Sequence, residues 1–82
     1  MAFPAISKRF GIAVRNRRIA LDLTQELLAE RAGLHATYVG MIERGIRNPT
    51  LDVAERLAKA LKVELPILTA ESLAERSAKG RK

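Results

Sequence analysis

The chain has 82 residues, 48% of them hydrophobic, and a formal net charge of +6, which suits one small domain and is too apolar for a disordered tail. It contains no cysteine, one histidine and two aspartates, so a disulfide framework, a thiolate metal site or a catalytic triad lacks the residues to form it. We therefore expect no enzyme activity, no metal, no cofactor and no small-molecule ligand.

The basic residues are concentrated at the two ends of the chain. Residues 1–21 carry five Lys and Arg and no acid, residues 22–75 carry six bases and nine acids, and residues 76–82 carry four bases. This distribution favours a polyanionic partner, either nucleic acid or an anionic membrane surface. No run approaches the roughly 20 apolar residues of a membrane span, and no signal peptide is visible. We expect a cytoplasmic protein without a membrane partner.

Helical periodicity predicts five short helices and an all-α fold, because no period-two alternation persists. The first helix is expected over about residues 7–21. Its buried side should carry Phe10, Ala13, Val14 and Leu21. Arg17 interrupts this side, and we interpret it as a long side chain at the edge of the core or, with nearly equal weight, as a phosphate contact.

The next two helices are separated by Gly33, Leu34 and His35 alone. Thr24 is a favourable N-cap for the second helix, and Gly33 suits the positive φ at its end. The third helix should run from about Ala36 to Arg44, bury Val39 and Ile42, and stop at Gly45. Two short helices joined by a three-residue turn that contains glycine form a helix-turn-helix, here over about residues 24–44.

The fourth helix should be capped by Thr50, and the fifth should begin near Pro66. The buried face of the fourth helix is expected to contain Leu51, Ala54, Leu57, Ala58 and Leu61. Four apolar residues of the fifth helix belong either to the monomer core or to a dimer interface: Leu65, Ile67, Leu68 and Leu73. The short chain with apolar residues left over at its end favours the interface of a two-fold homodimer. We expect an N-terminal extension over 1–6, one domain over 7–76 and a basic tail over 77–82, frayed from Ala78.

Several motifs spread over about residues 10–65 resemble the Cro and lambda-repressor-like helix-turn-helix family, also called XRE. The motifs are Leu23-Thr24-Gln25, Leu28-Ala29, Ala32-Gly33, Ile42-Glu43-Arg44-Gly45 and Arg47-Asn48-Pro49-Thr50. The resemblance implies a compact five-helix domain that binds DNA as a dimer with its third helix in the major groove, the docking geometry established for this family. Thr37-Tyr38 together with Ile42-Glu43-Arg44 and Arg47-Asn48 also looks like the controller proteins of restriction–modification systems, although phage repressors and antitoxins share much of the pattern.

The resemblance also implies roles for single residues. Gln25 matches a phosphate-binding position at the start of the second helix, where the helix dipole favours an anion. The DNA-reading face would contain Ala36, Thr37, Gly40 and Met41, with Tyr38 beside them. Arg47 and Asn48 would reach a phosphate or a nearby base. His35 and Arg44 border this surface and complete the predicted DNA-binding set, although each is also explained as an exposed residue at a helix end.

Arg18 and Glu43 match a family pair that forms a partly buried salt bridge between the first and third helices. Arg18 is therefore assigned to the fold and not to DNA. Three positions depart from the family pattern. Arg17 stands where many members have an apolar residue. His35 stands at an N-cap where Ser, Thr or Asp is usual, and Asp22 ends the first helix where Gly is usual.

The leading hypothesis is a sequence-specific transcriptional regulator that binds a palindromic operator in double-stranded DNA as a homodimer. The alternative is an antitoxin whose main partner is a toxin protein bound by the C-terminal helix. A basic amphipathic module on an anionic membrane ranks last, because it explains neither the two glycine stops nor the compact turn.

Overall fold

The computed structural model describes residues 5–80, with side chains described for residues 5–74, and this part of the chain forms five helices and no strand. The helices are α1 (Ala5–Ala20), α2 (Gln25–Ala32), α3 (Ala36–Glu43), α4 (Leu51–Ala60) and α5 (Leu65–Gly80). The predicted all-α, five-helix architecture is confirmed. None of these helices is both long enough and apolar enough to cross a membrane.

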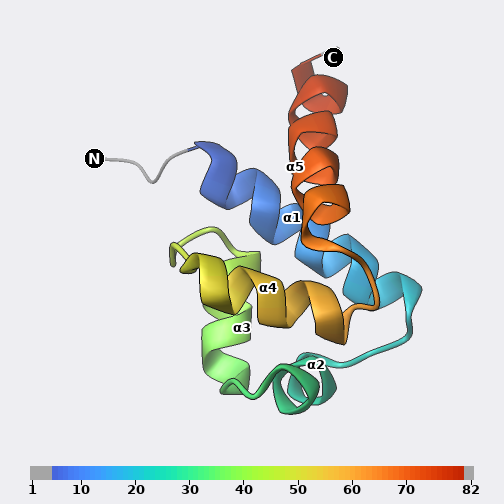
Figure 1. Cartoon of the computed structure of the whole chain (residues 1–82). Helices are drawn as coiled ribbons and strands as arrows, with labels where there is room; N and C mark the ends of the chain where they lie inside the picture. The colour runs from blue at the N-terminus through green and yellow to red at the C-terminus, as the bar shows by residue number, and fades with distance from the viewer. Residues whose placement is uncertain (1–4, 81–82) are drawn as a thin grey trace.

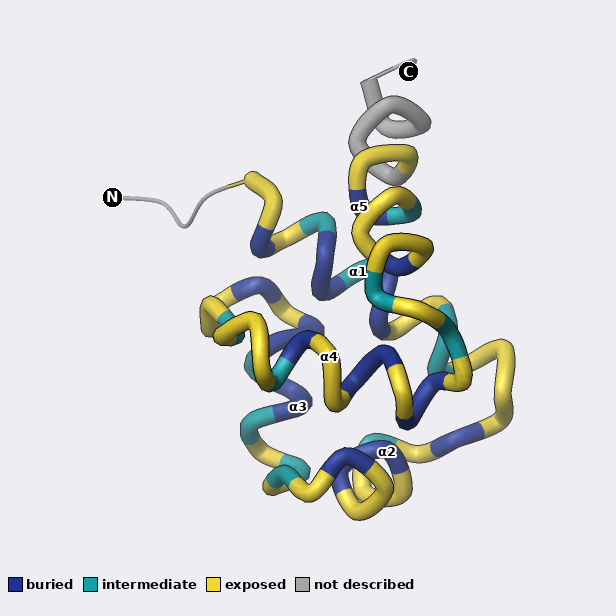
Figure 2. Tube along the Cα trace, in the orientation of Figure 1, coloured by how far each residue is buried: buried dark blue, intermediate teal, exposed yellow. Residues whose placement is uncertain are grey.

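The five helices surround one core, to which each contributes side chains. α1 packs against α3 and α5, while α2 packs against α3 and α4 (Figure 1). The largest fully buried apolar side chains are Leu28, Ile42, Leu57, Leu61, Leu68, Val14 and Val39. In Figure 2 the buried segments of the helices face one another. Burying a side chain of this size stabilises the fold by roughly 1.5–3 kcal/mol, so the small core depends on every one of them.

The predicted helix ends are present where the sequence placed them. Thr24 Oγ1 accepts a hydrogen bond from the Leu27 amide at 3.0 Å, and Thr50 Oγ1 accepts one from the Val53 amide at 3.1 Å. Gly33 ends α2 with φ 71°, in the left-handed region that glycine adopts without strain. These residues therefore fix where α2 begins and ends and where α4 begins.

Two of the departures from the family pattern, Asp22 and His35, have different consequences. Asp22 adopts φ 59°, the left-handed conformation that explains why Gly is usual here and that Asp tolerates better than most residues. His35 is the N-cap of α3 but makes no side-chain capping hydrogen bond. The start of α3 is therefore held by its packing and not by its cap.

Three predictions about burial are wrong. Leu51 is 82% exposed because it is the first residue of α4, and Leu21 is 39% exposed because it lies in the turn after α1. Leu68 was assigned to a dimer interface but is fully buried in the core. The inner side of α5 runs through Leu68 and Ser72, both 0% exposed, so these residues serve the monomer fold.

The helix at each end is longer than expected. α1 begins at Ala5, inside the predicted N-terminal extension, of which residues 1–4 lie outside the described residues. α5 continues to Gly80, three residues into the segment that was expected to be frayed. The last two residues of the predicted basic tail, Arg81 and Lys82, lie outside the described residues.

Candidate nucleic-acid interface

α2 and α3 form the predicted helix-turn-helix. The turn between them is closed by a hydrogen bond from the Leu34 amide to the Ala29 carbonyl at 2.8 Å. Ala29 is 3% exposed, and Val39 and Ile42 of α3 are fully buried. Because one side of α3 is anchored in the core, its opposite side is presented outward as a rigid surface.

The outer side of α3 brings together most of the residues expected to read DNA. A shallow hollow is lined by Gly33, Leu34, His35, Thr37, Tyr38, Met41 and Arg47. Thr37 and His35 are exposed, while Met41 and Tyr38 are half-buried. Ala36 is half-buried against the core, at the inner margin of this surface. Figure 1 shows α3 at the left edge of the molecule, partly behind the start of α4.

Tyr38 and Arg47 contact each other across this hollow. The guanidinium carbon of Arg47 lies 5.6 Å from the centre of the Tyr38 ring, within the range of a cation–π contact. Arg47 comes from the loop between α3 and α4, which has no regular secondary structure around it. The aromatic ring therefore restricts where an otherwise free cation lies. The sequence indicated both residues, but not their contact.

The predicted ion pair between Arg18 and Glu43 is present. Arg18 Nε lies 2.7 Å from Glu43 Oε2, and Nη2 donates to Oε1 at 3.1 Å. The side chains are 13% and 2% exposed, so the bridge is nearly buried. Hydrogen bonding to Glu43 raises the pKa of Arg18, against the opposing effect of burial. Arg18 also donates to the carbonyl of Leu23 at 2.8 Å, which ties α1 to the start of the helix-turn-helix.

Glu43 holds Gln25 as well, a contact that sequence reasoning missed. Gln25 Nε2 donates to Glu43 Oε1 at 3.0 Å. The expected phosphate-binding residue is thus hydrogen-bonded to the buried ion pair. Its position at the first turn of α2 is as predicted.

Gly40 differs from its prediction. It was expected on the exposed DNA-reading face, but it is buried under the ends of the Gln25 and Arg44 side chains. Arg44 itself is exposed. Asn48 is also exposed, and its Oδ1 accepts a hydrogen bond from Ser7 Oγ at 2.7 Å, which leaves its amide nitrogen available for a ligand.

Arg17 lies away from this surface. Its guanidinium forms two hydrogen bonds to Glu71 of α5, one of them 3.0 Å from Nε to Oε1. The hydrogen bond from Arg17 lowers the pKa of the Glu71 carboxyl. The charge is therefore paired with a carboxylate on α5, which supports the interpretation of Arg17 as a long side chain at the edge of the core, and its phosphate contact stays an untested prediction.

The comparison with protein families agrees with this geometry. The family model described as Helix-turn-helix matches residues 14–68, which include all of α2, α3 and α4. The chain belongs to the helix-turn-helix family. The resemblance to XRE-type transcription regulators, drawn from the motifs, is confirmed.

Relatives within this family include controller proteins. Control protein C.SmaI of Serratia marcescens is 49% identical over 74 residues, covering 89% of this chain and 88% of that protein. Control protein C.BamHI of Bacillus amyloliquefaciens is 46% identical over 56 residues, covering 67% and 69%. The crystal structure of the restriction-modification controller protein C.AhdI from Aeromonas hydrophila matches with a TM-score of 0.77 at 43% identity, covering 79% of this chain and 98% of that one.

Proposed function

We propose that the chain is a sequence-specific transcriptional regulator that binds double-stranded DNA with α3 in the major groove. The observation that carries this proposal is the outer side of α3, where Thr37 and Met41 lie beside Tyr38 and Arg47 at the edge of one hollow. A helix anchored on one side and exposed on the other fits the width of the major groove.

The uncharged outer side of α3 and the polar and basic residues around it have different roles, the first in specificity and the second in affinity. α3 carries no basic residue, and its one acid, Glu43, is paired with Arg18. Thr37 can bond to a base edge or contact a thymine methyl group, and Met41 can make apolar contacts only. Arg47, Arg44 and Gln25 around the helix would bind phosphates and provide most of the affinity.

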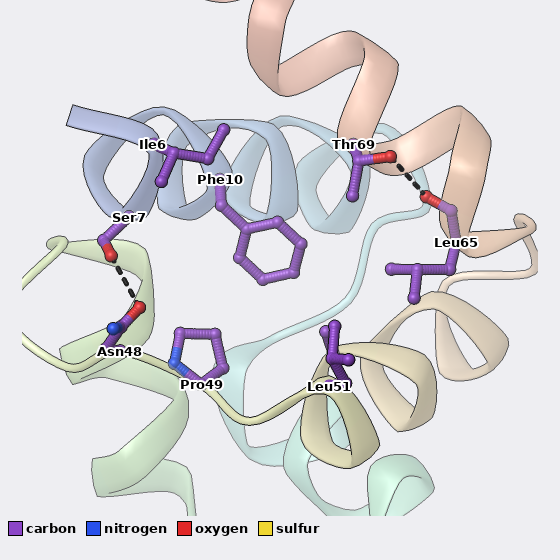
Figure 3. A pocket seen from close by; sticks show the side chains of 9 residues that line it. Ile6, Ser7, Phe10, Asn48, Pro49, Leu51, Leu65 and Thr69 are labelled. Carbon is purple, nitrogen blue, oxygen red and sulfur yellow. Dashed lines mark hydrogen bonds between the residues drawn. The ribbon is translucent and has the colours of Figure 1, made fainter. Parts of the chain in front are cut away.

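We further propose a homodimer, supported by an apolar cleft about 240 Å³ in volume (Figure 3). Ile6 and Phe10 of α1, Pro49 and Leu51 at the start of α4, and Leu65 at the start of α5 line it. The Thr69 hydroxyl at its rim donates to the carbonyl of Leu65 at 3.1 Å, so it adds little polarity. Leu51 lines one side of the cleft and is 82% exposed.

A two-fold axis would place Leu51 of one protomer against the cleft of the other, which is the self-complementary arrangement of a two-fold dimer. Of the residues expected in the interface, Leu65 lines the cleft. Leu73 is 55% exposed and lies about two turns further along α5, about 80° around the helix from Leu65. Ile67 is 48% exposed but points about 200° away from Leu65 around the helix. We therefore place Leu51, Leu65 and Leu73 in the interface and leave Ile67 outside it.

The most specific role we propose is control of a restriction–modification system. C.SmaI, called a control protein, resembles this chain over nearly the full length of both chains, and C.AhdI is described as a restriction-modification controller. The antitoxin alternative gains no support from these relatives.

The proposal is tested by selecting bound duplexes from a random-sequence pool. We expect an enriched palindrome whose two half-sites are centred about one helical turn apart, on the order of 34 Å. Two chains should bind each duplex, as measured by sedimentation. Enrichment of no sequence would contradict specific recognition, and one chain per selected duplex would contradict the dimer.

A further inference from the structure

The buried carboxylate of Glu43 accepts a hydrogen bond from Gln25 as well as from its ion-pair partner Arg18. Its Oε2 accepts from Arg18 Nε at 2.7 Å, while its Oε1 accepts from both Arg18 and Gln25. Arg18 cannot readily turn away, because it is also bound to the carbonyl of Leu23. The carboxylate is therefore a fixed acceptor placed beside the first turn of α2.

Gly40 provides the space in which the Gln25 amide lies. A Cβ atom built on Gly40 would be 3.4 Å from Gln25 Oε1 and 3.7 Å from Nε2. Gly40 and Glu43 are three residues apart on α3, so they share one side of the helix. Gly40 packs against the Gln25 amide, and Glu43 accepts a hydrogen bond from the amide nitrogen.

This arrangement leaves one hydrogen of the amide free. A glutamine amide has two N–H donors, and Glu43 takes only one. A phosphate oxygen accepts hydrogen bonds, so the second N–H is the group that DNA would use. Immobilising a long side chain on binding weakens affinity by about two- to tenfold, a loss that is avoided when the side chain is already held.

We propose that Glu43 and Gly40 are positioning residues that hold the Gln25 amide ready for a DNA phosphate before DNA arrives. This inference rests on the proposed DNA-binding function. It gives Gly40 a role in binding that requires a small residue at this position, in place of the base contact expected from the sequence.

The packing of the Gln25 amide against Gly40 is tested by two substitutions of Gly40 that differ in side-chain size. In Gly40→Ala the methyl group meets the Gln25 amide at ordinary contact distance, so binding to the duplex selected by the wild type should stay within about twofold. In Gly40→Val the branched side chain displaces the amide. The affinity should then fall about tenfold, the effect of one hydrogen bond to a charged group. Thermal unfolding of both variants verifies the fold.

Combination with Gln25→Ala separates positioning from other effects. We expect Gly40→Val to weaken binding in the wild-type background and to have no further effect once Gln25 is absent. Arg44 Nη1 is also near this position, 3.3 Å from the same built Cβ atom. Equal losses in both backgrounds would mean that valine disturbs Arg44 or contacts DNA directly, and would overturn the proposal.

Side-chain NMR of the free protein tests the role of Glu43 without DNA. The Gln25 amide should be as rigid as the backbone in the wild type and in Gly40→Ala, and mobile in Gly40→Val and in Glu43→Gln. A mobile amide in the wild type would overturn the proposal. If the amide is rigid but the protein selects no duplex, the proposed function and the phosphate role of the amide are contradicted. The positioning of the amide by Glu43 would then still stand.

Discussion

At the scale of single residues, the sequence indicated which side chains gather at the interface but not how they pair. Gln25, Thr37 and Arg47 could be named because each occupies a position of a motif. The contacts of Gln25 with Glu43 and of Arg47 with Tyr38 join different elements. Such contacts depend on the packing of α2, α3 and the following loop, which no local pattern encodes. The burial of Gly40 was missed for the same reason.

Tyr38 should act through Arg47, because the ring restricts the guanidinium to one side of the hollow. Tyr38→Phe keeps this contact, whereas Tyr38→Leu removes it. We expect the leucine variant to bind DNA about two- to fivefold more weakly than the phenylalanine variant, as for a cation–π contact of about 0.5–1 kcal/mol. Fluorescence anisotropy measures both affinities. In an Arg47→Ala background the two variants should bind alike, and a persistent difference would contradict this role.

At the scale of helices, propensity and capping rules predicted most of the fold. Thr24, Gly33 and Thr50 end or begin helices as expected, because caps are local interactions. The outward position of Leu51 could not be predicted, because helical periodicity shows which residues share a face but not where a neighbouring helix ends. The sequence likewise offered no partner for Arg17, since Glu71 lies 54 positions away.

The pair between Arg17 and Glu71 should stabilise the contact of α5 with α1 in a pH-dependent way. The pKa of Glu71 is lowered in the folded state, so its contribution is present above the unfolded pKa and is lost as pH falls through the folded value. The two side chains are 34% and 40% exposed, so we expect Glu71→Gln to lower the free energy of unfolding by only about 0.5 kcal/mol at pH 7.

Urea unfolding at neutral and at acidic pH measures this contribution. The difference in the free energy of unfolding between wild type and Glu71→Gln should disappear at a pH well below 4. There Glu71 is protonated and is as neutral as the glutamine that replaces it. Glu55→Gln is a matched control, because Glu55 is exposed on α4 and forms no ion pair within the described residues. A difference that persists at acidic pH would show that the glutamine disturbs packing instead of charge.

At the scale of the whole molecule, the net charge of +6 suggested a polyanionic partner but not where it binds. The structure shows two of the arginines of α1 paired with acids, Arg17 with Glu71 and Arg18 with Glu43. Two other basic groups come from the segment that follows α3: Arg47 lines the hollow on its outer side, and Arg44 lies beside Gly40. The proposed dimer face is also a property of the whole fold, because residues of α1, α4 and α5 together line the cleft.

Leu51→Glu should separate the protomers, because each would bring a carboxylate against the apolar cleft of the other. Leu51 is exposed, so the substitution should change the free energy of unfolding of the isolated protomer by less than about 0.5 kcal/mol. Sedimentation of the free protein should show a dimer for the wild type and a monomer for Leu51→Glu. Ile67→Glu, on the other side of α5, should stay dimeric, and the reverse result would move the interface to Ile67.

The central claim is that the outer side of α3 specifies the DNA sequence while the groups around it provide affinity. It is tested most directly by selecting duplexes in parallel with the wild type, Thr37→Ala and Gln25→Ala. We expect Thr37→Ala to change the preferred base at one symmetric pair of positions, and Gln25→Ala to weaken binding to all duplexes while selecting the same palindrome. An unchanged palindrome for Thr37→Ala, or an altered one for Gln25→Ala, would contradict the account.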